Sequence, residues 1–288
     1  MDTNFLMIEG IPFPGKTYNR DDIISIRDEF VVKDEDTIVL SYPKSGTNWM
    51  IEIVGLIHCK GNPTWTHSVL SWERSPWLES IGGYRYVKNN RNDVHFYTSH
   101  LPIQLFPKSF FNSKAKVIYL IRNPRDVLTS GFHFFKAVQY IKSPETFDQY
   151  FECFLQGNVI YGSWFDHIRD WLQMQGKENF LVIFYEELKQ NTASTVEKIS
   201  QFLGKQLGPE ELNSVLKNMS FEVMSSNKMA NFSILPEDIL DHSKGQLMRK
   251  GVTGDWKCHF TVAQNEAFDK VYQEKMANFP PGSFPWEK

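Results

Sequence analysis

The sequence predicts an α/β fold: a single domain in which a mainly parallel central sheet is flanked by helices. Three short apolar runs that resemble strands are each followed by a segment with apolar residues at helical spacing. This alternation is typical of a parallel sheet with helices on both faces. The 288 residues contain no linker rich in Pro, Gly or Ser and no internal repeat, so we expect one domain over residues 1–288.

The first predicted strand and helix enclose a polar loop. Residues 36–42 (DTIVLSY) form a short apolar run bounded by charged residues and by Pro43, which predicts a strand. Residues 48–60 carry apolar residues at helical spacing, with Thr47 or Asn48 as the expected N-cap. The loop at 42–49 therefore follows the carboxyl end of a strand, where ligands bind in parallel sheets.

Two further strand and helix units follow along the chain. Residues 116–121 (KVIYLI) predict a buried strand, and residues 127–140 a helix whose start is signalled by Asn123 as N-cap, Pro124 at the first helical position and Asp126 in the first turn. Residues 180–185 (FLVIFY) predict a third strand and residues 192–203 a third helix.

The loop at 42–49 (YPKSGTNW) has the composition of an anion-binding site. It offers consecutive backbone N–H groups, a glycine, two hydroxyls and Lys44 just before a helix. Backbone donors and the positive end of a helix favour phosphate or sulfate, each oriented charge interaction contributing on the order of 0.3–1 kcal/mol. Lys44 adds a point charge that can follow a transferring group. An ordinary strand-to-helix turn is the alternative interpretation.

A second segment matches a nucleotide-binding pattern by its letters alone. Residues 10–17 (GIPFPGKT) satisfy G-x-x-x-x-G-K-[ST]. Pro12 and Pro14 have no N–H groups with which to hold phosphate, and the sequence shows no apolar strand before Gly10. We therefore reject this match.

The bulk composition narrows the function classes. The net charge of −3 argues against a nucleic-acid-binding protein, which normally carries a strongly basic face. The hydrophobic fraction of 41% supports a sizeable core, and the aromatic fraction of 15% is richer than a core usually requires. We expect some rings to line an apolar pocket, although a core role is more common for any single ring.

The sequence favours a soluble, cytosolic protein without membrane association. Its first 15 residues have no basic n-region and no apolar stretch of signal length, and no run approaches 18 apolar residues. The three scattered cysteines, Cys59, Cys153 and Cys258, lack the spacing of metal ligands and fit free thiols in a reducing compartment.

Four motifs together resemble those of the cytosolic sulfotransferases: YPKSGTNW at 42–49, SHLP at 99–102, RNPRD at 122–126, and RKG at 249–251 followed by GDWK at 254–257. The resemblance runs the whole chain and is strongest to the hydroxysteroid, alcohol or bile salt branch. It implies a P-loop-like phosphosulfate-binding loop and transfer of a sulfuryl group from 3′-phosphoadenylyl sulfate (PAPS) to a hydroxyl of a small apolar acceptor, leaving adenosine 3′,5′-bisphosphate (PAP). No metal is needed in this family.

The resemblance also implies a nucleotide site. The 5′-phosphosulfate end is held by Lys44, Ser45, Gly46, Thr47, Asn48 and Trp49. Trp49 also stacks on the adenine, a site completed by Tyr185 and Phe221. The 3′-phosphate is held by Arg122, Ser130, Arg249, Lys250 and Gly251. Arginine suits bidentate phosphate contacts. A surface arginine at 122 and a mid-helix serine at 130 bonded to its own backbone are the alternatives for those two residues.

His100 is the expected general base. An alcohol is a poor nucleophile at neutral pH, and an imidazole that takes its proton typically contributes about 10²- to 10⁴-fold. Transfer is expected to be in line with a loose transition state, as in phosphoryl transfer, and Lys44 is expected to stabilise the leaving phosphate. A lone histidine is more often a surface or packing residue. The match of residues 99–102 to the family motif favours the catalytic role instead.

The chain departs from the family pattern at several positions. Met219 stands where this branch usually has a hydroxyl residue, and Ser220 is a possible substitute. The family motif Lys-Asn-His reads Lys257-Cys258-His259 here. Thr98 replaces a lysine that is typical of the phenol and estrogen branch, which favours the alcohol branch.

The acceptor pocket and the oligomeric state are predicted from the resemblance alone. The expected apolar acceptor wall consists of Trp72, Trp77, Phe135 and Phe232. These rings could bury a sterol or bile-acid skeleton at about 25 cal/mol per Å², and a core role is nearly as common. Residues 226–248 are a candidate lid. A family dimerisation pattern predicts a homodimer through Lys257, Thr261, Val262 and Glu266.

Three alternative functions stay open. The acceptor could be a phenol rather than a hydroxysteroid, bile acid or related alcohol. A P-loop nucleotide kinase or NTPase shares the strand, loop and helix but needs Mg²⁺ with ATP and a true Walker A loop. A non-catalytic carrier of sterol or nucleotide would show the same binding features, although Lys44 together with His100 favours catalysis.

Overall fold

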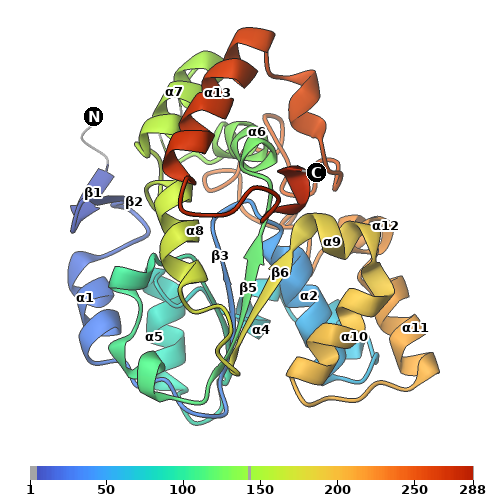
Figure 1. Cartoon of the computed structure of the whole chain (residues 1–288). Coiled ribbons are helices and arrows are strands. Elements are labelled where there is room, and N and C mark those ends of the chain that lie inside the picture. Colours follow the sequence, from blue (N-terminus) through green and yellow to red (C-terminus); the bar gives the residue numbers. More distant parts are fainter. Residues whose placement is uncertain (1–4, 142–143, 288) are drawn as a thin grey trace.

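The computed structural model describes residues 5–141 and 144–287, and its centre is a parallel sheet in the order β4-β3-β5-β6 (Figure 1). The strands are β3 (Thr37–Ser41), β4 (Phe96–Ser99), β5 (Lys116–Ile121) and β6 (Phe180–Phe184). A separate antiparallel hairpin joins β1 (Phe5–Ile8) and β2 (Ile11–Pro14). The predicted fold class is confirmed. The predicted span 1–288 extends beyond the described residues at 1–4, 142–143 and 288.

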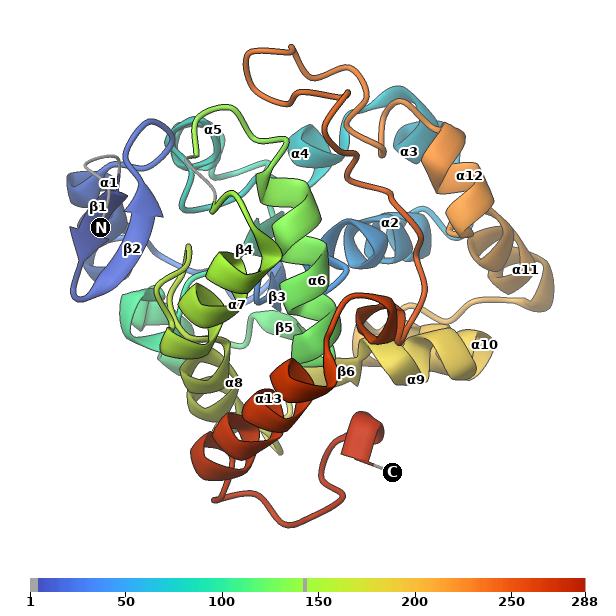
Figure 2. The same cartoon turned by 90° about the horizontal axis from the view of Figure 1, so that it is seen from above.

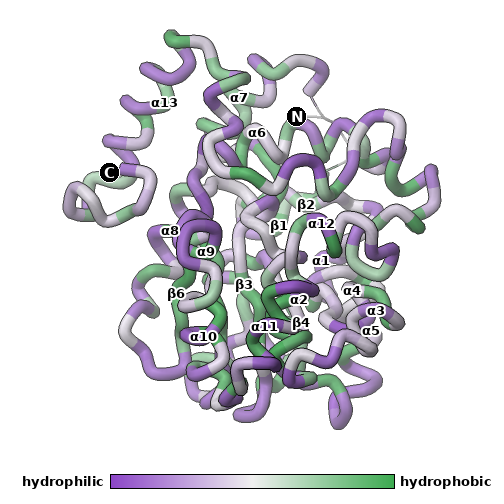
Figure 3. The backbone as a smooth tube through the Cα atoms, turned by 90° about the vertical axis from the view of Figure 1, so that its right-hand side faces the viewer, coloured by the Kyte–Doolittle hydropathy of each residue, from purple (hydrophilic) through white to green (hydrophobic). Residues whose placement is uncertain are grey.

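Helices cover both faces of the sheet because neighbouring strand residues point to opposite sides. Ile38 and Leu40 of β3 belong to the larger hydrophobic cluster, whereas Val39 between them belongs to a second one. The strands and α2 form the most hydrophobic part of the chain (Figure 3). The second cluster packs the sheet against α2 (Thr47–His58), α10 (Thr192–Phe202) and α11 (Pro209–Asn218).

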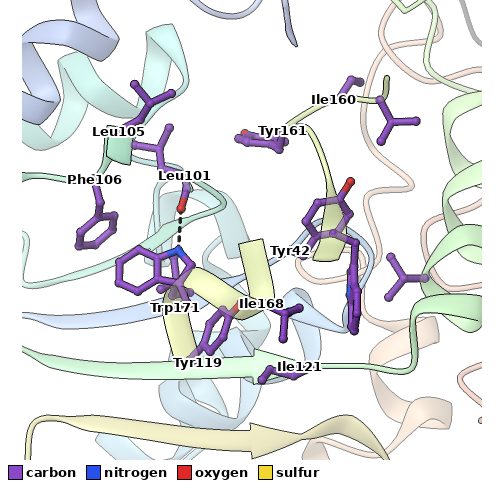
Figure 4. Packing of buried hydrophobic residues seen from close by; sticks show 14 of the residues in the cluster. Tyr42, Leu101, Leu105, Phe106, Tyr119, Ile121, Ile160, Tyr161, Ile168 and Trp171 are labelled. Carbon is purple, nitrogen blue, oxygen red and sulfur yellow. Dashed lines mark hydrogen bonds between the residues drawn. The ribbon is translucent and has the colours of Figure 1, made fainter. Parts of the chain in front are cut away.

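The larger cluster packs the opposite face. It includes side chains from α1 (Arg20–Asp28), α5 (Ile81–Asn89), α7 (Phe147–Gln156), α8 (Trp164–Leu172) and α13 (Val262–Lys275). In this cluster the indole Nε1 of Trp171 donates to the carbonyl oxygen of Leu101 at 3.1 Å (Figure 4). That hydrogen bond anchors the chain just beyond the carboxyl end of β4.

The remaining elements connect the strands and helices already described. They are α3 (Thr64–Ser68), α4 (Ser71–Arg74), α6 (Pro124–Phe135), α9 (Tyr185–Gln190), α12 (Phe221–Ser226) and the 3₁₀ helices η1 (Ile103–Leu105), η2 (Lys108–Asn112), η3 (Asp255–Cys258) and η4 (Pro285–Glu287). The segment between α12 and η3 runs beside α6 on its way to α13 (Figure 2).

The predicted strands lie where the sequence places them, within a residue at each end. The start of α6 is also as predicted, since Asn123 accepts a hydrogen bond from the backbone N–H of Arg125 at 3.0 Å and Pro124 is the first helical residue. The predicted N-cap of α2 is wrong: Thr47 is already helical, and the cap is Gly46 with φ 103°.

Two expectations about α6 and the hairpin need correction. The helix predicted to reach residue 140 ends at Phe135, because the next residues pair with the candidate lid. The backbone N–H of Gln139 donates to the Ile239 carbonyl at 3.1 Å, and the backbone N–H of Asp241 donates to the Ala137 carbonyl at 2.8 Å.

A strand, β1, does precede Gly10, contrary to our expectation. It pairs with β2 as a hairpin, so residues 10–17 still lack the strand, loop and helix of a P-loop.

One buried ion pair joins two elements next to the site. Arg74 of α4 donates from Nη2 to Glu52 of α2 at 2.7 Å, and their side chains are 0% and 1% exposed. Arg74 also donates from Nε to the Val69 carbonyl at 3.0 Å. The pair fixes the short helix α4, which carries Trp72, against the helix that follows the loop at 42–49.

Candidate active site

A cavity of about 670 Å³ lies at the carboxyl ends of the strands and brings together nearly all of the predicted site residues. From the predicted nucleotide site it is lined by Lys44, Gly46, Thr47, Asn48, Trp49, Arg122, Ser130, Tyr185, Phe221, Arg249, Lys250 and Gly251. From the predicted catalytic and acceptor sites it is lined by Lys44, His100, Trp72, Trp77, Phe135 and Phe232. The motifs, which are far apart in sequence, thus face one space.

Two predicted residues do not line the cavity. Ser45 is 0% exposed, and its Oγ has no hydrogen-bond partner among the described residues. Ser220 is the N-cap of α12 and accepts from the Val223 N–H at 3.3 Å. Its hydroxyl oxygen is therefore already engaged in the helix start, which weakens the idea that it substitutes for the residue at 219.

The loop between β3 and α2 has a backbone that exposes N–H donors. Lys44 and Gly46 have φ values of 69° and 103°, in the left-handed region. Within the described chain no side chain caps the N-terminus of α2, so its first-turn N–H groups are available to an anion. A Cβ on Gly46 would lie 2.8 Å from the ring of Tyr185, so glycine is required for both conformation and space.

Lys44 is held in an apolar and cationic setting. Its Nζ lies 3.5 Å from the ring centroid of Phe134. Burial lowers the pKa of Lys44 to about 7, and the nearby charges of Arg122 and Arg249 lower it further in the same direction. Near neutral pH the amine is therefore poised to gain a proton when an anion arrives beside it.

The pKa of Lys44 leads to a prediction about nucleotide binding. A bound anion raises a pKa that starts near 7, so binding of PAP at pH 8 is expected to take up protons and to weaken as the pH rises above 7. Titration calorimetry in two buffers of different ionisation enthalpy measures the uptake. Glu186, whose pKa burial raises to about 7, is the second group near the site that titrates here. Uptake should fall in Lys44→Gln and persist in Glu186→Gln; the reverse pattern would contradict the assignment to Lys44.

Cationic side chains border one end of the cavity. The Arg122 guanidinium lies 4.3 Å from the ring centroid of Tyr185 and donates to the carbonyl oxygens of Lys44 at 3.2 Å and Val252 at 2.9 Å. In the segment before η3, Lys250 donates to Asp255 at 2.7 Å, and Arg249 pairs with the same carboxylate. The guanidinium and ammonium groups are thus gathered around a site suited to a phosphate.

Aromatic side chains form the neighbouring wall. Trp49 lies 5.3 Å from Tyr185 between ring centroids and donates from Nε1 to the carbonyl oxygen of Met219 at 2.9 Å. The Met219 side chain is 1% exposed and packs in the core. Met219 therefore supports Trp49 through its backbone and directs its side chain away from the cavity.

Gly251 must be a glycine for two reasons. Its φ is 64°, and a Cβ there would come well inside van der Waals contact of the Phe221 ring. Gly251→Ala is expected to raise the Kd for PAP by about tenfold or more, since either the ring or the backbone must move. Gly254→Ala is the matched control, because Gly254 has φ 78° but open space around its Cβ position. Calorimetry should show the larger loss for Gly251→Ala; equal losses would mean that the ring contact is unimportant.

His100 has the geometry of a base. Its Nδ1 lies 2.6 Å from the carbonyl oxygen of Ser41; a carbonyl only accepts, so Nδ1 carries the proton and Nε2 keeps a lone pair. Burial lowers the pKa of His100 to about 4, and the charge of Lys44 acts in the same direction. At neutral pH the ring is therefore neutral and able to accept a proton.

The aromatic side chains of the predicted acceptor wall lie next to one another. Phe232 lies 4.8 Å from Trp72 and 6.5 Å from Trp77 between centroids, and Trp77 lies 5.9 Å from His100. The cavity is also lined by residues that were not predicted from the sequence. They come from the hairpin and the turn after it, from α5 and from two loops: Pro14, Thr17, Tyr18, Tyr86, Tyr140 and Tyr161. Pro14 and Thr17 fall in the rejected pattern at 10–17, and no motif marks the other four, because only the folded chain brings these segments together.

The described residues contain neither a cluster of metal-ligating side chains nor a helix that could span a membrane. Across residues 5–141 and 144–287, no three His, Cys, Asp or Glu side chains come together in a way that could hold a metal ion. Within the same part of the chain, none of the helices has the length and apolar character needed to cross a membrane.

The fold and the cavity bring together a loop with free backbone N–H donors, a group of cationic side chains and a buried neutral histidine beside an aromatic pocket. Residues 34–280 match the family model described as sulfotransferase domain, and the chain belongs to the sulfotransferase family. It is therefore a sulfotransferase, and the predicted family is confirmed.

Known relatives and a solved structure agree with this assignment. The 3-beta-hydroxysteroid sulfotransferase of Cavia porcellus is 59% identical over 288 residues, and sulfotransferase 2A1 of Macaca fascicularis is 59% identical over 287 residues; each alignment covers 100% of both chains. The crystal structure of mouse sulfotransferase SULT7A1 complexed with PAP superimposes with a TM-score of 0.79 at 32% identity, covering 96% of each chain. The predicted hydroxysteroid branch is the branch of these relatives.

Proposed function

We propose that this sulfotransferase moves the sulfuryl group of PAPS to a hydroxyl of a hydroxysteroid, a bile acid or a related alcohol, within one domain over residues 1–288. The observation that carries the proposal is that His100, with a free Nε2 lone pair, lines the same cavity as the anion-binding loop. The acceptor class follows the name of the guinea-pig relative, and the nucleotide follows the PAP bound in the mouse structure.

The residues at the loop fit the phosphosulfate group. Buried Ser45 Oγ and Asn48 Oδ1 have no partner among the described residues, and the first turn of α2 presents free N–H groups. We assign the 5′ end of PAPS to this loop, the 3′-phosphate to Arg122, Ser130, Arg249, Lys250 and Gly251, and the adenine to Trp49, Tyr185 and Phe221. PAPS supplies the activated sulfuryl group; we assign no role to a metal.

The chain's own residues then manage charge and protons. His100 Nε2 takes the proton of the acceptor hydroxyl as the new oxygen–sulfur bond forms and the sulfur–oxygen bond to the 5′-phosphate breaks. Lys44 stabilises the negative charge that develops on that phosphate oxygen. Both groups line the cavity, and in-line transfer requires them to act on opposite sides of the transferring group.

The residue at position 98 supports an alcohol acceptor over a phenol. Thr98 on β4 is 0% exposed, and its Oγ1 is 2.7 Å from Ser75 Oγ. The phenol branch carries a lysine at this position, whereas this chain has a small, fully buried threonine there. Trp72, Trp77, Phe135 and Phe232 provide the apolar wall for a flat hydrocarbon skeleton.

One assay separates the candidate functions. The protein is incubated with PAPS, or with ATP and Mg²⁺, and with hydroxysteroids, bile acids and phenols, and the products are separated by mass. Sulfated steroid or bile acid formed from PAPS alone is expected. Phenol sulfate as the main product would move the chain to the phenol class, phosphorylated product would indicate a kinase, and binding of PAPS and sterol without product would indicate a carrier.

We also propose a cytosolic homodimer through Lys257, Thr261, Val262 and Glu266. All four residues are exposed around the start of α13, and Val262 is 77% exposed, so its side chain is accessible to a partner subunit. The three free cysteines suit the cytosol.

The dimer proposal predicts the effect of one charge. Val262→Glu is expected to convert the protein to a monomer at micromolar concentration, because an isologous contact places the new carboxylates close together. Sedimentation velocity measures the mass. Val31→Glu is the matched control, since Val31 is 63% exposed and lies outside the dimerisation pattern. A dimer in both variants, or a wild-type monomer, would contradict the proposal.

A further inference from the structure

A buried carboxyl group lies directly behind the proposed base. Glu79, in the segment between α4 and α5, is 0% exposed. Its Oε1 accepts two hydrogen bonds, from the backbone N–H of His100 at 2.7 Å and from the hydroxyl of Tyr161 at 2.9 Å. Its Oε2 has no hydrogen-bond partner in the part of the chain that the structure describes. One oxygen thus joins the main chain of His100 to a second segment.

The backbone of His100 depends on such contacts because it lies outside the sheet. β4 is an edge strand that ends at Ser99, so the N–H and C=O of His100 have no ladder partners. Glu79 accepts a hydrogen bond from the His100 N–H, and His167 of α8 donates from Nε2 to the carbonyl oxygen of His100 at 3.2 Å. The imidazole itself is fixed by the Ser41 carbonyl. Three protein groups therefore set the position of the base.

The second segment held by Glu79 is part of the acceptor wall. Tyr161 lines the cavity, and its ring meets the His100 ring at 5.4 Å between centroids with a 78° angle. Figure 4 shows Tyr161 on the loop that precedes α8. Since its hydroxyl hydrogen goes to Glu79, the hydroxyl of Tyr18, 2.7 Å away, donates to the Tyr161 oxygen. Tyr18, which follows the hairpin, also lines the cavity. The hydrogen bonds therefore run from the backbone of His100 through Glu79 and Tyr161 to Tyr18.

We propose that Glu79 is a positioning residue of the transfer reaction: through Oε1 it fixes the distance between the His100 imidazole and the acceptor wall at Tyr161. This inference rests on the proposed role of His100. Both donors, the His100 N–H and the Tyr161 hydroxyl, bond to the same oxygen, so we expect the function to require an acceptor at Oε1 rather than a carboxylate charge. Glutamine can supply that acceptor, and leucine cannot.

Glu79→Gln and Glu79→Leu test this directly. Glu79→Gln is expected to keep kcat/KM for a hydroxysteroid within about threefold of wild type. Glu79→Leu is expected to lose about 10²-fold, since small displacements of a reacting group can cost that much. The Kd for PAP should change little in both, because the nucleotide residues are held by other elements. In Glu79→Leu the acid limb of the kcat/KM profile should move to higher pH, as a less confined imidazole regains a more ordinary pKa.

A pair of tyrosine variants separates positioning from general loss of buried hydrogen bonds. Tyr161→Phe removes one donor to Glu79 and is expected to raise the acceptor KM several-fold. Tyr84→Phe is the matched control. The Tyr84 hydroxyl on α5 lies 2.8 Å from Ser25 Oγ on α1, and Tyr84 does not line the cavity, so the kinetics of this variant should equal wild type.

Several outcomes would overturn the proposal. These are wild-type kinetics in Glu79→Leu, equal losses in Glu79→Gln and Glu79→Leu, or a loss of activity matched by an equal loss of PAP affinity and melting temperature. The last pattern would indicate a purely structural role. Absence of transfer in the wild type would instead refute the proposed function, so the two failures are distinguishable.

Discussion

Replacing His100 by alanine is expected to lower kcat/KM for the hydroxylated acceptor by about 10²- to 10⁴-fold at pH 7, the typical contribution of a general base. The expectation follows from the tautomer: Nδ1 donates to the Ser41 carbonyl, which leaves Nε2 as the free acceptor. Because burial lowers the pKa of His100 to about 4, the wild-type ring is neutral at pH 7 and ready to take a proton.

The same geometry predicts how activity depends on pH. Protonation of Nε2 removes the base, so wild-type kcat/KM should be flat from neutral pH down to about pH 5 and should fall towards pH 4, where half of the free enzyme carries the imidazolium. An unperturbed histidine would instead lose activity near pH 6.5. Initial rates with PAPS and a hydroxysteroid, measured from pH 4 to pH 7, give this acid side of the pH profile.

Two controls make the His100 experiment specific. His67→Ala removes an exposed histidine of α3 and should leave the rate unchanged. The Kd for PAP should stay close to wild type in His100→Ala, since the predicted phosphate ligands lie elsewhere. Equal activity in His100→Ala and wild type would remove this residue from the mechanism, and a parallel loss of PAP binding would point to collapse of the site.

The sequence predicts those parts of the fold that are encoded locally. Residues 116–121 are a continuous apolar run because β5 lies between two strands and is covered on both faces, and the structure has this strand as predicted. The start of α6 is also predictable from the sequence, since Asn123 and Pro124 act on their immediate neighbours. The loop at 42–49 was found from its own residues in the same way.

What the sequence did not reveal depends on contacts between distant residues. β4 is only four residues long and follows a charged stretch, and its strand character comes from pairing with β3. The end of α6 at Phe135 is set by pairing with residues 239–241. Glu79 is separated from His100 by 21 residues and from Tyr161 by 82, so no local pattern joins these three residues. The motifs thus locate the reacting groups, whereas their supports require the fold.

The buried pair between α2 and α4 should dominate the stability of this end of the molecule. Glu52→Leu is expected to lower the free energy of unfolding by about 3–5 kcal/mol, because it leaves the guanidinium of Arg74 buried without its carboxylate. Both side chains are at most 1% exposed, so neither water nor salt can replace the lost partner. Urea unfolding followed by far-UV circular dichroism measures the change.

A double variant tests whether the cost comes from the unpaired charge. Glu52→Leu combined with Arg74→Met removes both charges, and it should recover most of the lost stability, since apolar side chains can replace a buried ion pair. Lys108→Ala is the matched exposed case: its ion pair with Asp28 has a lysine side chain that is 68% exposed, and its loss should cost at most about 1 kcal/mol. If Glu52→Leu cost no more than Lys108→Ala, α4 would have to be held by its apolar contacts alone. The position of Trp72 in the acceptor wall would then be independent of the helix that carries the anion-binding loop.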